Sequence, residues 1–229
     1  MPMSESMEMS IASTIRRAVR RGGVRFWRSE EFEGGRTAVE HALSRLASEG
    51  ELIRVRRGLY WRGRKGAFGM GRPLAMDLAR AVIDSPGIGP AGWSATNALG
   101  LSTQLPGRET IAVPSRAPSG LEDILWVSRD ARRARRDQKL SPIEVALLEA
   151  LEGFEDYVDL PPEKAVARLL EILLSDDVRP ERLVRASKTE PARTRRRLRD
   201  LLVRAGLNDA ADRVPPARTA RSIPALAAA

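Results

Sequence analysis

Cysteine is absent from this chain of 229 residues, and histidine occurs once, as His41. Without cysteine there is no disulfide framework, no thiolate metal site and no cysteine nucleophile. A lone histidine leaves no plausible ligand set for zinc, so we expect no metal and no cofactor. A serine hydrolase is also disfavoured, because the segment from Gly92 to Thr96 lacks the second glycine of a nucleophile elbow.

Long apolar runs are missing as well. No run approaches the ~18 residues that are needed to span a bilayer. The first residues, MPMSESMEMSIAST, have neither the charged nor the apolar region of a signal peptide. The sequence therefore predicts a soluble, cytoplasmic protein without a membrane partner.

Lysine is scarce, since the 39 basic residues comprise four lysines and 35 arginines, a bias typical of a GC-rich genome. The position of the basic residues is more informative than their type. Residues 10–72 contain 15 basic and 6 acidic residues, a local charge of +9 that equals the net charge of the whole chain. A compact module with this charge favours a polyanion as its partner, and duplex DNA is the commonest one.

The first 64 residues show the pattern of a winged helix-turn-helix DNA-binding domain. The expected elements are a helix over 10–20, a strand over 24–27, a short helix from Ser29, a helix over 36–49 and a two-stranded ribbon over 51–62. Apolar residues at helical spacing, with glycines at the ends, carry the helix predictions. The order helix, strand, helix, helix, ribbon is that of a winged helix.

The third helix, over 36–49, is the candidate recognition helix, because a major groove admits one helix whose polar face is turned outward. The ribbon adds arginines on its solvent side and at its tip, where a wing meets phosphates. The candidate DNA-binding residues are Arg36, Thr37, His41, Ser44 and Arg45 of the helix and Arg54, Arg56 and Arg57 of the ribbon. The alternative is an ordinary solvated surface, as any amphipathic helix shows. Four arginines of the first helix are open to the same two interpretations: Arg16, Arg17, Arg20 and Arg21.

The rest of the chain predicts a second, larger domain. A glycine-rich basic stretch over 65–72 is expected to be a linker. Residues 73–213 predict an α/β domain with a small sheet, including strands over 110–113 and 124–127, and a C-terminal helical bundle. Residues 214–229, with three prolines and an alanine-rich end, are expected to form a flexible tail. The fold class is therefore expected to be α+β and mostly helical.

Two arginine clusters lie in the larger domain: Arg132, Arg133, Arg135 and Arg136, and Arg193, Arg195, Arg196, Arg197 and Arg199. They add DNA contacts, dock an acidic surface of a partner, or form solvated helix faces paired with nearby acids. Between the clusters, the segment from Ser141 to Glu144 is a capping box with proline at the first helical position. It predicts the start of a helix.

Three stretches resemble the AbiEi family of antitoxins: LASEGELIRVRRGLY at 46–60, GPAGWSATNALGLSTQLP at 89–106 and TIAVPSR at 110–116. The resemblance extends over residues 11–205. It implies an N-terminal winged helix, a larger antitoxin domain, repression of the chain's own operon and neutralisation of a nucleotidyltransferase toxin. We therefore expect a type IV antitoxin and not an enzyme. Its partners would be an inverted-repeat operator in double-stranded DNA and the cognate toxin, to which no individual contact residue can be assigned.

Two other functions stay open. The chief alternative is a stand-alone winged-helix regulator whose larger domain senses a ligand or another partner. The second is a DNA nuclease, which needs an Asp and a Glu-x-Lys on adjacent strands, and neither predicted strand shows them. A nucleotidyltransferase is disfavoured, because no carboxylate follows Gly92-Trp93-Ser94 until Glu109 to help hold magnesium.

Overall fold

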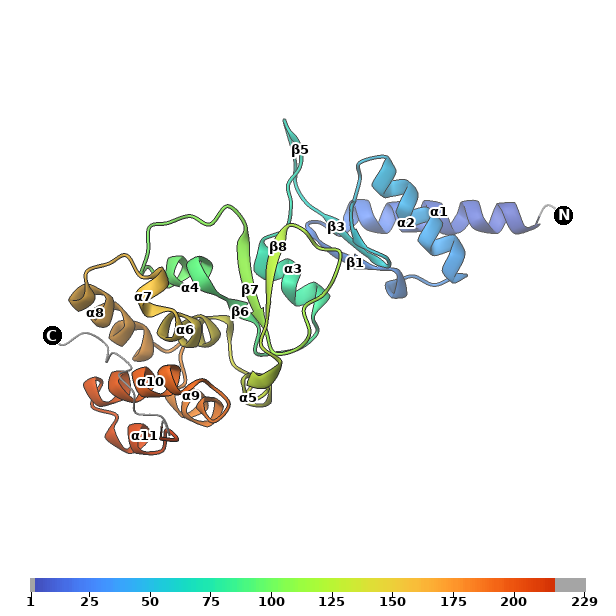
Figure 1. Ribbon diagram of the computed structural model, residues 1–229. Coiled ribbons are helices and arrows are strands. Elements are labelled where there is room, and N and C mark those ends of the chain that lie inside the picture. The colour runs from blue at the N-terminus through green and yellow to red at the C-terminus, as the bar shows by residue number, and fades with distance from the viewer. Residues whose placement is uncertain (1–2, 217–229) are drawn as a thin grey trace. The chain divides into compact units, whose positions relative to one another are not determined.

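The computed structural model describes residues 3–216, and the chain divides into two compact units, residues 1–77 and 78–229 (Figure 1). Helices predominate and are combined with small sheets of two or three strands, so the fold class is α+β, as predicted. Within residues 3–216, every helix is too short or too polar to traverse a lipid bilayer.

The first unit opens with helices that flank a three-stranded sheet. Its elements are α1 (Met3–Arg21), β1 (Arg25–Arg28), the 3-10 helix η1 (Ser29–Glu31), α2 (Arg36–Ser48), β2 (Ile53–Arg56) and β3 (Leu59–Arg62). The strands are antiparallel in the order β1-β3-β2, so the last strand in sequence lies in the middle. The elements follow the predicted order. However, α1 begins at Met3 and not at Ser10, and the short second helix is a single 3-10 turn.

The core of this unit lies where α1 packs on α2. The buried side chains from the two helices are Ile15, Val19, Val39, Ala42, Leu43 and Leu46. Each fully buried Leu or Ile contributes about 1.5–3 kcal/mol to the free energy of unfolding. Trp27 of β1 joins the core, and Gly22 makes room for it, because a Cβ at Gly22 would lie 2.3 Å from the Trp27 ring. This burial fixes which face of α2 is turned to solvent.

The segment expected to be a linker forms a small hairpin instead. Its strands are β4 (Lys65–Gly66) and β5 (Gly69–Met70), which pair antiparallel (Figure 1). At its base, a Cβ at Gly63 would lie 2.1 Å from the carbonyl oxygen of Gly71. The same oxygen accepts a hydrogen bond of 2.8 Å from the Trp61 indole. The glycines therefore permit close backbone approach, which composition alone does not distinguish from a linker.

The second unit contains the other three-stranded sheet. The helix α3 (Ala75–Val82) spans the division between the units. The sheet comprises β6 (Gly89–Pro90), β7 (Glu109–Val113) and β8 (Ile124–Ser128), and α4 (Gly92–Ala98) connects β6 to β7. β6 is antiparallel to β7, whereas β7 and β8 are parallel. The two longer strands were predicted, and their parallel pairing is a finding of the structure.

The central helix of the second unit is α6 (Pro142–Glu152), whose residues 144–151 are all buried. It contacts β6, α4 and α10. The predicted capping box is confirmed: the backbone N–H of Glu144 donates to Ser141 Oγ at 3.4 Å, and the backbone N–H of Ser141 donates to Glu144 Oε2 at 2.7 Å. The helix therefore begins where the sequence indicates.

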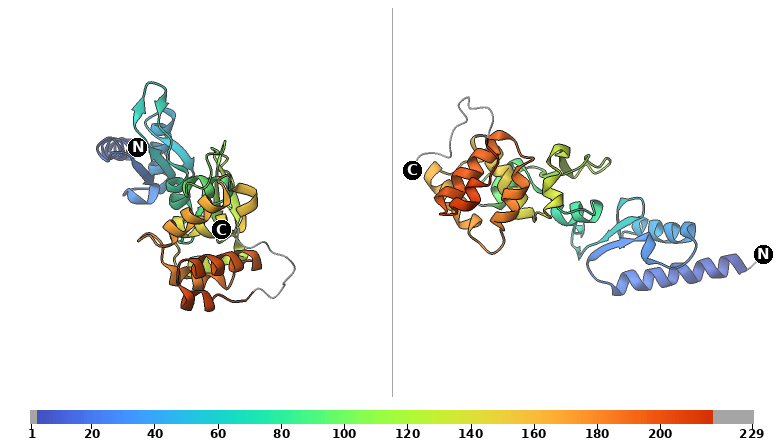
Figure 2. Two further views of the ribbon diagram at one scale, coloured as in Figure 1. Left: turned by 90° about the vertical axis from the view of Figure 1, so that its left-hand side faces the viewer. Right: turned by 90° about the horizontal axis from the view of Figure 1, so that it is seen from below.

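Helices surround α6 and complete the unit. They are η2 (Asp130–Arg132), α5 (Ala134–Asp137), α7 (Phe154–Tyr157), α8 (Pro162–Leu173), α9 (Pro180–Ser187), α10 (Ala192–Arg204) and α11 (Asn208–Asp212). Helices α8 to α11 gather at one end of the unit, as the predicted bundle requires (Figure 2). The predicted tail starts too early, because Val214 is buried in this core. Residues 217–229 of that tail lie outside the described residues.

Candidate nucleic-acid interface

The helix α2 turns a polar face to solvent because its apolar stripe is buried in the core. All five helix side chains predicted to contact DNA are exposed: Arg36, Thr37, His41, Ser44 and Arg45. The helix begins after Gly35, which makes no side-chain cap for the first-turn N–H groups. Uncapped first-turn N–H groups at a helix start favour contact with anions. The start of α2 thus combines exposed donors with an exposed arginine.

The ribbon formed by β2 and β3 exposes the three arginines that the sequence singled out. In β2, Arg54 and Arg56 are exposed, whereas the residues between them and before them are half-buried. The strand register shifts between Arg54 and Arg56, which places a β-bulge at Val55 and increases the local twist. Arg57 follows at the exposed turn beside Gly58, whose φ of 75° favours glycine.

One carboxylate joins the helix to the ribbon. Arg36 Nε lies 3.3 Å from Glu40 Oε1, and Arg57 Nη2 lies 3.2 Å from Glu40 Oε2. The hydrogen bond from Arg57, and after it the one from Arg36, holds the pKa of the Glu40 carboxyl below its ordinary value. The start of α2 and the tip of the ribbon therefore present their guanidinium groups together. No role was predicted for Glu40 from the sequence, although its spacing of four from Arg36 was a signal for an ion pair.

Tyr60 pairs with Arg54 across the ribbon, and its side chain is buried in the core of the first unit. Burial raises the pKa of Tyr60, while the charges of Arg54 and Glu40 act on it in opposite directions. Of the predicted residues, Arg36 and Arg57 are brought together by the ion-pair partner that they share, Glu40.

Two arginines of α1, for which phosphate contact or a solvated face was expected, have internal partners. Arg16 Nη2 lies 2.5 Å from Glu49 Oε2, and Arg20 Nη2 lies 2.6 Å from Glu51 Oε1. These ion pairs connect α1 to the turn between α2 and β2. They stabilise the position of the candidate recognition helix within the first unit.

Two of the four arginines in the first cluster of the second unit are internal. Arg132 and Arg135 are buried, at 7% and 0% exposure. They belong to an ion-pair network of three arginines and three glutamates: Arg129, Arg132, Arg135, Glu149, Glu152 and Glu190. For Arg132 and Arg135 the expectation of DNA or partner contact is wrong, because their guanidinium groups are buried among carboxylates.

The second cluster is divided between the interior and the surface. Arg197 is buried at 1% exposure, donates to the carbonyl oxygen of Leu151 at 2.8 Å and pairs with Glu155. It therefore holds α10 against the end of α6 and has no surface role. The remaining exposed members of the two clusters are Arg133, Arg136, Arg193, Arg196 and Arg199. These, together with half-buried Arg195, keep the interpretations that the sequence left open.

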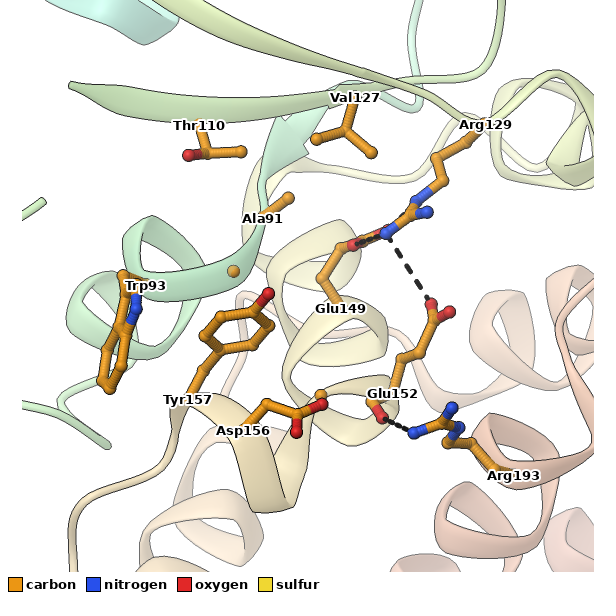
Figure 3. A pocket seen from close by; sticks show the side chains of 12 residues that line it. Ala91, Trp93, Thr110, Val127, Arg129, Glu149, Glu152, Asp156, Tyr157 and Arg193 are labelled. Carbon is orange, nitrogen blue, oxygen red and sulfur yellow. Dashed lines mark hydrogen bonds and ion pairs between the residues drawn. The ribbon is translucent and has the colours of Figure 1, made fainter.

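A pocket with a volume of about 350 Å³ lies in the second unit between the sheet and α6 (Figure 3). Trp93 and Tyr157 form one side of it, with ring centroids 5.5 Å apart in an edge-to-face arrangement. Arg129 and Glu149 form its opposite side and pair with each other at 2.6 Å. In the described part of the chain, no three His, Asp or Glu side chains cluster in a way that would hold a metal ion.

Comparison with known proteins gives a family match over part of the chain and a similar fold. A family model described as "Family of unknown function (DUF6088)" matches residues 10–113, a segment that includes α2, the ribbon and β7. The comparison with curated proteins gave no match. The chain is similar to a crystal structure of the RV2827C protein from Mycobacterium tuberculosis, with 19% identity and a TM-score of 0.51. The alignment covers 97% of this chain and 87% of that one, and at this identity it supports the fold alone.

Proposed function

We propose that the first unit is a winged helix-turn-helix that binds duplex DNA, with α2 in the major groove and the ribbon on the phosphate backbone. The observation that carries the proposal is the position of Glu40 between Arg36 and Arg57. It holds cations from the helix start and the ribbon tip on one surface. A major groove admits one helix, whose N-terminal residues reach base edges while a neighbouring ribbon contacts phosphates.

The exposed side chains suit these roles. A guanidinium group at Arg36 or Arg45 has the fork geometry that pairs with guanine, and it also pairs with phosphate. The hydroxyls of Thr37 and Ser44 bind a phosphate or a base, and His41 projects from the same helix. Arg54, Arg56 and Arg57 supply the sequence-independent attraction that makes up most non-specific affinity.

We further propose that the protein is an antitoxin that represses its own operon and counteracts a nucleotidyltransferase toxin. The resemblance of segments 46–60 and 89–116 to AbiEi-family antitoxins supports this role. The second of these segments forms β6, α4 and β7, so it makes up one continuous part of the second unit. Binding to an inverted-repeat operator implies two copies of the protein on the DNA.

A second candidate is a regulator whose second unit responds to a small ligand. The pocket beside Trp93 and Tyr157 favours it, because about 350 Å³ falls within the volume range of small-molecule sites. Gene neighbourhood separates the two candidates, since an antitoxin gene should adjoin a nucleotidyltransferase gene. Co-expression with that neighbour, scored for growth, then tests neutralisation directly.

The decisive experiment for DNA binding uses the full chain and a fluorescent random-sequence duplex. We expect binding that weakens steeply as salt rises from about 50 to 200 mM, because cationic contacts release counterions from DNA. Selection from a random duplex pool should then enrich an inverted repeat. Failure to bind duplex at the lowest salt concentration would overturn the proposal.

A further inference from the structure

The surface proposed to meet DNA contains a carboxylate at its centre. Glu40 is partly covered, with 20% of its side chain exposed, whereas Arg36 and Arg57 are 82% and 73% exposed. Each carboxylate oxygen accepts one hydrogen bond from one of the two arginines. The two cations therefore reach Glu40 from separate elements, one from α2 and the other from the ribbon turn.

In this position the carboxylate of Glu40 accepts hydrogen bonds from guanidinium N–H groups that would otherwise be free to bind phosphate. Its pKa is lowered by the hydrogen bonds from Arg57 and Arg36, so Glu40 is ionised at neutral pH. The three side chains together carry a charge of +1, whereas the two arginines alone would carry +2. A DNA phosphate that approaches either guanidinium competes with Glu40 for it and is repelled by the carboxylate.

We propose that Glu40 is a specificity-determining residue, which holds Arg36 and Arg57 in place and weakens their binding to DNA that offers only phosphates. This inference rests on the proposed function of the first unit. Where a base edge offers two acceptors, Arg36 gains a bidentate pair that replaces its single hydrogen bond to Glu40. On other sequences only phosphates are offered to Arg36, without a base edge that pairs with it. Glu40 therefore increases the difference in affinity between selected and random duplexes.

A direct hydrogen bond between Glu40 and a base is the alternative role that the experiment must distinguish. A glutamate can accept a hydrogen bond from the N4 amino group of cytosine. In that case, removal of the charge would weaken binding to selected sequences and leave random duplex unaffected. The geometry favours the first role, because Glu40 is only 20% exposed and each of its oxygens already accepts a hydrogen bond from an arginine.

The experiment compares wild type with Glu40→Gln in the full chain, on random duplex, over a series of salt concentrations. We expect the variant to bind about 3- to 10-fold more tightly near 0.1 M salt. The reason is that Arg36 and Arg57 no longer have to give up their exposed ion pairs with Glu40, each of which is weak and screened by salt. The slope of log K against log salt should become steeper by about 0.9, because one further cation acts on DNA. Preference for a selected duplex over random duplex should fall.

Two controls accompany this variant. Glu181→Gln makes the same charge change at an exposed ion pair in the second unit, with Arg213, and should leave affinity and slope unchanged. Glu40→Asp retains the charge and should keep the wild-type slope. A steeper slope in Glu181→Gln would show that net charge, and not the carboxylate of Glu40, is the cause. Thermal unfolding of each variant confirms that the fold is retained.

The outcomes separate the inference from the function on which it rests. If wild type fails to bind random duplex, the proposed function fails. If wild type binds and Glu40→Gln binds equally or more weakly on random duplex, DNA binding stands and the role of Glu40 is overturned. The inference is supported if Glu40→Gln binds more tightly, with a steeper salt dependence and less selectivity, while the two controls behave like wild type.

Discussion

Arg135 and Glu190 lie 55 residues apart in sequence and form a bidentate ion pair with no exposure to solvent. Arg135 Nε lies 2.7 Å from Glu190 Oε1, and its Nη2 lies 2.8 Å from Glu190 Oε2. Burial opposes the charge of Arg135, but the hydrogen bonds and attraction from Glu190 outweigh it and raise the pKa of this guanidinium. The pair connects α5 to the segment after α9 through the interior of the second unit.

We expect Glu190→Gln to lower the free energy of unfolding by about 3–5 kcal/mol, because it leaves the buried charge of Arg135 without its main partner. Denaturant unfolding of the full chain measures this loss. A double variant, Arg135→Met with Glu190→Leu, should be more stable than Glu190→Gln, since it removes the buried charge as well as the partner. Equal stability of wild type and Glu190→Gln would contradict the importance of this pair.

The buried carboxylate of Glu144 makes stability depend on acid pH. Burial alone would raise its pKa, but hydrogen bonds from the Arg179 side chain and from the backbone of Ser141 and Arg179 lower it. A carboxyl whose pKa is lowered on folding contributes stability above its unfolded pKa of about 4.3. That contribution is lost as pH falls through the folded pKa, which lies below this value.

Glu144→Gln isolates this effect, because glutamine also completes a capping box. At pH 7 the variant should be less stable than wild type by about 1.5–3 kcal/mol, the usual worth of hydrogen bonds to a charged group. The difference should shrink as pH falls below about 4, where the wild-type carboxyl takes up a proton. Denaturation midpoints measured at both pH values test this, and a difference independent of pH would refute it.

The fold of the first unit could be predicted from the sequence because its signals are local. The spacing of Val39, Leu43 and Leu46 fixes the buried face of α2, and that burial alone turns the candidate DNA-binding residues outward. Elements shorter than one or two helical turns, such as α5 (Ala134–Asp137), give no periodicity to detect. The structure, and not the pattern, was needed to find them.

The roles of charged residues were less predictable, since pairing depends on contacts that are distant in sequence. Arg132 and Arg133 are neighbours in an arginine-rich segment, yet one is buried in an ion network and the other is exposed. The pairing of Glu40 with Arg36 is local in sequence, but its contact with Arg57 crosses from the helix to the ribbon turn. Composition cannot distinguish a charged residue that pairs inside the protein from one that is exposed, because both are the same residue type.

The ribbon should contribute affinity without sequence preference. We expect Arg56→Ala with Arg57→Ala to weaken binding to all duplexes and to reduce the salt slope by about 1.8, since two phosphate contacts are lost. Fluorescence anisotropy over a salt series on random and selected duplexes measures both. A matched variant, Arg116→Ala with Arg185→Ala, removes two exposed arginines of the second unit that lie outside both arginine clusters. If both double variants lose affinity equally, the effect belongs to net charge and the ribbon has no particular role.

The start of α2 should contribute sequence preference. Arg36 occupies the first position of the helix, and N-terminal residues of a recognition helix reach the base edges. Arg36→Lys retains the charge but loses the fork that pairs with guanine. We therefore expect nearly unchanged affinity for random duplex and a preference for selected duplex that falls by about 1–3 kcal/mol.

Arg45 lies in the last turn of the same helix and provides the matched comparison. Arg45→Lys should preserve both affinity and preference if Arg45 contacts a phosphate, because a lysine serves there as a point charge. Competition binding with selected and random duplexes measures the two ratios side by side. Loss of preference in Arg45→Lys together with an unchanged Arg36→Lys would mean that α2 lies in the groove with its C-terminal end toward the bases, which would reverse the proposed docking orientation.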